Sequence, residues 1–173
     1  MMLKQEQGIN DFRVYEDGTQ YYGMAESTLP EISTKGDDIT GAGIAGSVKG
    51  TYVGQIEAMT MNLSFRNPQP EAVKLSEPRN HQLDLRGARQ VKNNQSGIIE
   101  QRPLKIVVIG FPTKFTPGKL APASTSDTSV ELAITYYAMW IDGKKLMEVD
   151  QFGFKYEVNG VDYLADVRKA LGQ

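Results

Sequence analysis

Apolar and polar residues alternate with a period of two along most of the chain, which predicts strands. The pattern is clearest in residues 59–66. Its apolar set is Met59, Met61, Leu63 and Phe65, and its polar set is Thr60, Asn62, Ser64 and Arg66. A strand of this kind buries one face and exposes the other, as in an antiparallel sheet. We therefore expect the apolar set in the core.

Short turn sequences divide the other strands. Asp17-Gly18 separates the alternating segments 12–16 and 19–26, and this dipeptide is a strong signal for a tight hairpin. Asp142-Gly143 is similar, whereas Asn159-Gly160 is expected to end the strand 152–158 before a helix. Further strands are expected at 31–40, 81–86, 98–110, 130–140, 144–150 and 152–158. A helical turn is predicted over 70–76 and a flexible tip over 90–97. Residues 111–128 are expected to form an irregular excursion away from the core.

The last residues change to helical spacing. Val161, Leu164 and Val167 recur every three residues, Ala170 and Leu171 continue the stripe, and Gly172 is placed to end it. A helix is therefore predicted over 161–171, docked through this stripe. Four charged residues then point outward: Asp162, Asp166, Arg168 and Lys169.

The glycine-rich segment 41–50 has no large side chain that would anchor it in a core. We interpret it as a mobile loop between two strands, the second of them the strand 57–66. We expect residues 41–53 to become ordered only against neighbouring subunits. The residues expected to make those contacts are Gly41, Gly43, Ile44, Gly46, Val48, Gly50 and Tyr52. Residues 41–46 also match the dinucleotide pattern G-x-G-x-x-G, but that site requires a following helix, and the next residues are poor helix formers.

Composition narrows the possible chemistry. The chain has 173 residues, no cysteine, one histidine and a net charge of −2. Its length suits a single domain over 1–173, since single cores stop growing at about 250–300 residues. Thiolate chemistry and multi-histidine metal sites are excluded, and the basic excess of a general nucleic-acid binder is missing. No catalytic, metal or cofactor-binding residues are assigned, and no cofactor is expected.

Individual residues favour a structural protein over an enzyme. His81 lies in an alternating strand without a nucleophile partner, so a structural or surface role is expected. Tyr136 and Trp140 share a parity that predicts a place in the core, whereas Tyr137 faces away and hints at an interface. The first residues lack an apolar signal segment, and the longest apolar run is 106–109. We therefore expect no membrane anchor and a protein made in the cytoplasm.

The order and spacing of several segments resemble the major tail tube protein of contractile-tailed bacteriophages. The likeness extends to R-type phage-tail-like bacteriocins, the tailocins, including diffocin-like ones. It is carried at the C-terminus by Tyr136-Tyr137, Ile141-Asp142-Gly143-Lys144, Val158-Asn159-Gly160-Val161-Asp162 and Arg168-Lys169-Ala170-Leu171-Gly172. Residues 10–18, 23–30, the glycine-rich stretch before Tyr52 and 115–118 fit the same family.

This resemblance implies a mainly β fold of two packed antiparallel sheets, a sandwich or barrel with a flanking C-terminal α-helix and a long hairpin loop. It also implies hexameric rings that stack into a hollow inner tube, which sheath contraction drives through a bacterial envelope. The expected partners are further copies of the chain, the tail sheath protein, and the baseplate and tail terminator proteins. DNA or a tape measure protein would pass through the lumen, and the particle would be released on lysis.

Within that architecture, the polar face of the strand 57–66 is expected to line the lumen through Thr60, Asn62 and Ser64. Because a ring of arginines in the lumen would hold DNA, we expect Arg66 at a strand end, paired with a carboxylate. On the same reasoning the outward charges of the C-terminal helix, at 162, 166, 168 and 169, face the sheath. An alternative from another class is a small-ligand-binding β-barrel or a β-sandwich enzyme, which requires a closed pocket with convergent polar groups.

Overall fold

A computed structural model describes residues 4–173, which form twelve strands and two short helices. The strands are β1 (Lys4–Glu16), β2 (Thr19–Tyr21), β3 (Met24–Thr28), β4 (Thr34–Ile39), β5 (Val48–Ile56), β6 (Met59–Phe65), β7 (His81–Asn93), β8 (Ile99–Thr116), β9 (Thr128–Ile141), β10 (Lys144–Asp150), β11 (Lys155–Val158) and β12 (Val161–Asp162). The helices are α1 (Pro70–Lys74) and α2 (Ala165–Ala170).

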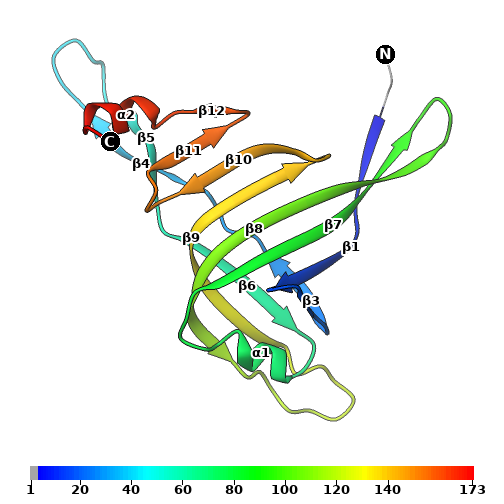
Figure 1. Ribbon diagram of the computed structural model, residues 1–173. Coiled ribbons are helices and arrows are strands. Elements are labelled where there is room, and N and C mark those ends of the chain that lie inside the picture. The colour runs from blue at the N-terminus through cyan, green and yellow to red at the C-terminus, as the bar shows by residue number, and fades with distance from the viewer. Residues whose placement is uncertain (1–3) are drawn as a thin grey trace.

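Ten strands belong to one antiparallel sheet. Eight of them follow the order β12-β11-β10-β9-β8-β7-β1-β2, while β6 pairs with both β9 and β3. Strands β4 and β5 form a separate two-stranded sheet that projects from the body beside α2 (Figure 1). The predicted fold class is confirmed: the chain is mainly β and antiparallel, with a short C-terminal helix.

The two layers of the body are halves of the same sheet. The first half of β9 pairs with β6 and the second half pairs with β10, while β8 accompanies β9 along both. Strands β8 and β9 therefore pass through both layers, and residues from both halves of the sheet meet in one core. A register shift between Ile109 and Gly110 of β8 lies where the change of partner occurs.

Strand β6 confirms the strongest sequence pattern. Met59, Met61, Leu63 and Phe65 are each at most 1% exposed. Burial of each such side chain contributes about 1.5–3 kcal/mol relative to exposure. The intervening Thr60, Asn62 and Ser64 lie on the opposite face, exposed or half-buried.

Two turn dipeptides predicted their hairpins correctly. Asp17 and Gly18 have φ of 49° and 78°, which fits a tight turn between β1 and β2. The pair Asp142-Gly143 likewise has positive φ and joins β9 to β10. Asn159-Gly160 also has positive φ, but it turns the chain into β12 rather than into the predicted helix. The helical turn at Pro70 is confirmed as α1.

Several strand boundaries were wrong. Strand β1 begins at Lys4 rather than at residue 12, and the segment 19–26, predicted as one strand, divides into β2 and β3. The strand predicted over 31–40 is shorter, since β4 spans Thr34–Ile39. Strand β7 continues to Asn93 and pairs with β8 throughout, so the flexible tip is confined to the turn between them. Strand β8 continues through Pro112 to Thr116, because β7 and then β9 supply its partners, and only 117–127 form the excursion. The strand expected from Phe152 begins at Lys155, after a turn.

The orientation of the aromatic residues in β9 was also wrong. Tyr137 is buried in the core, while Tyr136 and Trp140 are half-buried on the outer face. The register shift at Ile109 and Gly110 explains the reversal: Tyr136 pairs with Ile109 and Ile134 with Gly110, so Thr135 is an extra residue. One inserted residue exchanges the two faces of the strand beyond it.

The C-terminal helix is shorter than predicted. Val161 and Asp162 pair with β11 as a strand, and α2 begins only at Ala165. Of the expected apolar stripe, Leu164 is buried, whereas Val161, Val167 and Leu171 are exposed. The apolar residues of this segment are spaced by three to four positions, but they lie in a strand, a turn and a helix rather than in one helix.

Candidate functional site

The β4–β5 hairpin, called the arm below (residues 34–56), exposes apolar side chains. Ile39, Val48, Tyr52 and Val53 are each 51–57% exposed. The two strands pair with each other over Thr34–Ile39 and Val48–Ile56. A two-stranded hairpin is marginally stable on its own. The arm therefore presents apolar surface that this chain does not cover.

The predicted contact residues are spread along the arm. Gly41, Gly43, Ile44 and Gly46 lie in the loop between the strands, and the loop passes directly into β5, so the helix required by a dinucleotide site is missing there. Val48, Gly50 and Tyr52 lie within β5. The Tyr52 hydroxyl donates to Asp37 Oδ2 across the hairpin at 3.2 Å.

The base of the arm is attached to the C-terminal segment. Gly54 has φ of +76° and lies so close to the Leu164 side chain that a Cβ would collide with it. The Gln151 amide donates to the carbonyl oxygens of Ile56 and Glu57 at 3.5 and 3.3 Å. The arm therefore leaves the body at a defined position although its surface is exposed.

The body also has open strand edges. From Lys4 to Arg13, β1 pairs with β7 along one edge, and the other edge has no partner among the described residues. Within residues 4–173, β3 pairs with β6 alone. A groove of about 230 Å³ lies between these strands, lined by Ile9, Phe12, Ala25, Glu26, Ser27, Leu29, Leu85, Arg86, Gly87, Leu104 and Ile106. Unpaired edges are sites where further strands can add.

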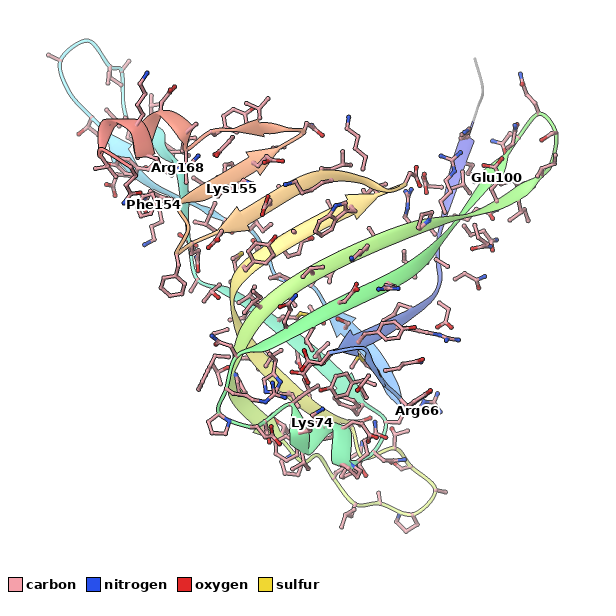
Figure 2. The ribbon with its side chains drawn as sticks, viewed as in Figure 1. Arg66, Lys74, Glu100, Phe154, Lys155 and Arg168 are labelled. Atoms are coloured by element: carbon pink, nitrogen blue, oxygen red, sulfur yellow. The ribbon has the colours of Figure 1, made fainter. Side chains whose placement is uncertain are left out.

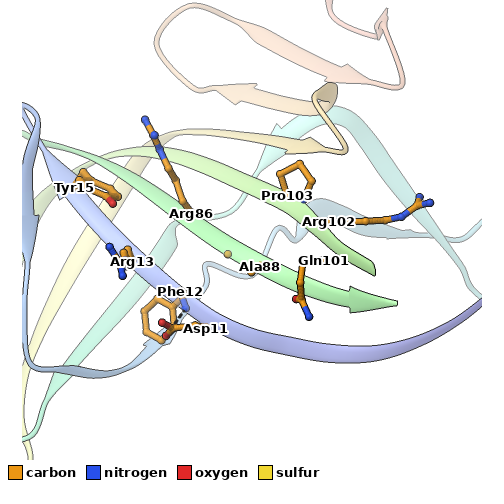
Figure 3. A pocket seen from close by; sticks show the side chains of 10 residues that line it. Asp11, Phe12, Arg13, Tyr15, Arg86, Ala88, Gln101, Arg102 and Pro103 are labelled. Atoms are coloured by element: carbon orange, nitrogen blue, oxygen red, sulfur yellow. Dashed lines mark hydrogen bonds between the residues drawn. The ribbon is translucent and has the colours of Figure 1, made fainter. Parts of the chain in front are cut away.

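A second hollow of about 420 Å³ crosses β1, β7 and β8 (Figure 3). It is an open depression on the sheet surface. The Arg86 guanidinium lies 5.1 Å from the centre of the Tyr15 ring and 2.8 Å from Asp84 Oδ2, so its charge is already paired. This surface does not supply the closed pocket that the ligand-binding alternative requires.

The polar face of β6 adjoins polar residues of β9. Asn62 pairs with Glu131 and Ser64 with Ser129 in the strand register. Arg66 lies just beyond the end of β6 and is exposed (Figure 2), as its expected position required. Its expected carboxylate partner is missing: no ion pair within residues 4–173 includes Arg66, and the nearby Asp127 pairs instead with Lys119 at 3.3 Å.

The four charges expected to face a sheath divide into two kinds. Asp162 and Arg168 form a partly buried ion pair of 2.6 Å, and Arg168 also donates to the Phe154 carbonyl (Figure 2). The hydrogen bond from Arg168 lowers the pKa of Asp162. Asp166 and Lys169 are exposed on α2. Of the four residues, Asp166 and Lys169 are the two that form no ion pair within residues 4–173.

Sequence reasoning missed an ion network on β9, β10 and β11. Glu148 Oε2 accepts from Lys145 and Lys155, while the Tyr136 hydroxyl donates to Oε1 at 3.0 Å. Burial raises the pKa of Glu148, but these three hydrogen bonds outweigh it and lower the pKa to about 2. Residues on three strands meet at Glu148, so local spacing in the sequence does not reveal this network.

A buried polar cluster of Glu16, Tyr21, Arg79 and His81 was also missed. A signal for it existed: Glu16 has the same strand parity as the core-facing Phe12 and Val14. The structural role expected for His81 agrees with its full burial.

Two further features complete the description of residues 4–173. They contain no cluster of three or more acidic or histidine side chains placed to hold a metal ion. None of their helices has the length and apolar character needed to cross a membrane.

Comparison with known proteins assigns the fold to a family. The tail tube protein of Escherichia phage P2 is 27% identical over 163 residues, which cover 92% of this chain and 93% of the relative. The major tail tube protein of Serratia phage KSP20 is 24% identical over 163 residues, covering 93% of each chain. Both relatives are tail tube proteins rather than enzymes.

A solved structure supports the same fold. The sheath/tube terminator of the PVC extracellular contractile injection system matches with a TM-score of 0.54 and 14% identity, covering 76% of this chain and 94% of that chain. Residues 6–172 match the family described as Phage tail tube protein FII. Since this match spans nearly the whole sequence, the chain belongs to the phage tail tube protein family.

Proposed function

We propose that six copies of this chain form a ring and that rings stack into the hollow inner tube of a contractile phage tail or tailocin. The family match over residues 6–172 carries this proposal. Sheath contraction then drives the tube through the target envelope. The slight acidity of the subunit suits a DNA conduit, since a basic lumen would retain phosphates.

The open edges of the body support lateral association. The unpaired side of β1 and the free side of β3 are available for strands of a neighbouring copy. Joining edges between copies in a closed ring removes every free lateral edge, which is the protection that barrels achieve.

The arm supports stacking. Its exposed Val48, Tyr52 and Val53 lie on a hairpin that projects from the body (Figure 1). In our proposal these residues, together with the loop 40–47, pack against copies in the next ring. Contact with a second copy supplies the burial that an isolated hairpin lacks.

The polar face of β6 is proposed to line the lumen through Thr60, Asn62 and Ser64. The chain has no native cysteine, so single-cysteine labelling tests this cleanly. Asn62→Cys should be protected from a bulky thiol reagent in assembled tubes and reactive in free subunits. Met61→Cys, on the buried face, is the matched control and should stay unreactive in both. Equal, rapid labelling of Asn62→Cys in both states would exclude the lumen assignment.

Other tail components complete the proposed setting. The exposed Asp166 and Lys169 of α2 face the sheath protein, and the tube ends meet baseplate and terminator proteins. DNA or a tape measure protein passes through the lumen. Assembly takes place in the bacterial cytoplasm, and the particle is released on lysis.

Electron microscopy of concentrated, negatively stained protein tests the proposal directly. Rings or tubes are the expected result. Persistent monomers whose melting temperature rises with a small ligand would contradict it and favour the ligand-binding alternative.

A further inference from the structure

A buried polar cluster joins the β1–β2 hairpin to the segment that follows α1. The Glu16 side chain is 1% exposed and that of His81 is 0% exposed. Oxygen Oε1 of Glu16 lies 2.7 Å from His81 Nδ1 and 3.0 Å from Arg79 Nη1, while the Tyr21 hydroxyl donates to Oε2. The four residues, called the Glu16 cluster below, come from β1, β2, the α1–β7 connection and the start of β7.

Both ring nitrogens of His81 face acceptors. Nδ1 faces the Glu16 carboxylate, and Nε2 lies 3.2 Å from the backbone carbonyl oxygen of Glu77. A neutral imidazole has one N–H and one lone pair, so it would direct a lone pair at one of these oxygens. An imidazole with protons on both nitrogens donates to both oxygens.

The alternative place for the shared proton is Glu16, and the surrounding groups disfavour it. Arg79 approaches the same oxygen as His81, and Tyr21 donates to the other oxygen. The Glu77 carboxylate lies 3.0 Å from Arg79 Nε and pairs with that guanidinium. Burial raises the pKa of Glu16, but donation from Tyr21, His81 and Arg79 outweighs it, so the pKa is lowered overall. A protonated Glu16 would weaken all three contacts.

We propose that His81 is a buried imidazolium whose counter-charge is Glu16, and that this ion pair is a conformational latch. It holds the β1–β2 hairpin against the segment 75–81, and so fixes the end of β1 from which the open edge Lys4–Arg13 extends. The inference stands on the contacts within one chain and does not depend on the assembly proposal.

Acid opens the latch. Because the pKa of folded Glu16 is lowered, its stabilising charge is present above the ordinary glutamate pKa and is lost as the pH falls through the folded value. Protonation of Glu16 then releases the two segments.

Nuclear magnetic resonance of the full-length, nitrogen-labelled chain tests the protonation directly, because His81 is the sole histidine. At neutral pH both ring nitrogens should give signals of protonated nitrogens. A signal from one unprotonated ring nitrogen would overturn the proposal.

Amide hydrogen exchange tests the latch itself. Glu16→Gln should accelerate exchange in residues 16–21 and 76–81 by about a hundredfold or more, since it leaves a buried imidazolium unpaired. Glu77→Gln is the matched control: its side chain is half-exposed and its backbone carbonyl is retained, so exchange should match the parent chain.

If Glu16→Gln fails to fold, Tyr21→Phe decides, because it removes one hydrogen bond and keeps the ion pair. It should accelerate exchange locally by about tenfold. No local acceleration in a folded Glu16→Gln or Tyr21→Phe variant would contradict a latch.

Discussion

Strands β5 and β6 are neighbours in the sequence and opposites in the structure. Two residues, Glu57 and Ala58, separate them. Strand β6 lies between β3 and β9 and buries all four of its large apolar side chains, whereas β5 pairs only with β4 and exposes Val48, Tyr52 and Val53. The comparison teaches that one chain buries the apolar face of β6 completely and, directly beside it, leaves Val48, Tyr52 and Val53 of β5 exposed.

Deleting Gly43–Lys49 should have the largest effect on assembly and little effect on the body. The arm contributes almost nothing to the core, so the free subunit should keep its thermal unfolding midpoint while stacking is lost. Sedimentation and electron microscopy measure stacking, and calorimetry measures the subunit. A deletion variant that still forms normal tubes would break the comparison.

Matched truncations in the two strands should separate stability from assembly. Leu63→Ala removes a fully buried side chain and should lower the free energy of unfolding by about 2–5 kcal/mol. Val53→Ala, at an exposed position, should change it by no more than about 0.5 kcal/mol and should weaken stacking instead. Urea denaturation of free subunits provides the numbers, and similar losses for both variants would contradict the contrast.

Acid should loosen the body through Glu148. The pKa of this carboxyl is about 2 in the folded chain, against an ordinary value of 4.5, so its stabilisation is complete above pH 4.5 and is lost as the pH falls toward 2. Glu148→Gln should flatten this part of the stability profile, measured by thermal unfolding at a series of pH values. Asp166→Asn, at an exposed site, should leave the profile unchanged. An unaltered profile in Glu148→Gln would show that the network contributes little.

The smallest effect is expected at α2. Reversing the charges of Asp166 and Lys169 together should spare folding and tube formation, because both side chains are exposed, and should weaken sheath binding. Co-sedimentation of sheath protein with preformed tubes measures this. Unfolding of the double variant would show that these residues stabilise the body rather than contact a partner.

Local rules predicted the elements that depend on local chemistry. Period-two alternation identified β6 and its buried face, and Asp17-Gly18 identified the first hairpin. The glycine-rich segment was correctly interpreted as a loop between strands, but the strand that follows it was wrong. The loop leads into β5, which begins at Val48 within the segment taken as loop, and not directly into the strand predicted over 57–66.

The errors occurred where distant segments decide the outcome. The reversal of Tyr136 and Tyr137 results from a register shift against β8, which no pattern within β9 reveals. Val161 and Asp162 form a strand because β11 is available beside them, despite helical spacing in the sequence. The Glu16 cluster contains residues that are 65 positions apart in the sequence. The strand parity of Glu16 was the one sequence signal that indicated a buried acid.

The contact between Gly54 and Leu164 constrains the order in which the subunit folds during synthesis. The arm leaves the ribosome first, while Leu164, whose side chain packs against the base of the arm, lies 110 residues further along the sequence than Gly54. Strand β6 likewise waits for β9 before its buried face is covered. A nascent chain therefore cannot present a positioned arm until Leu164 has been synthesised.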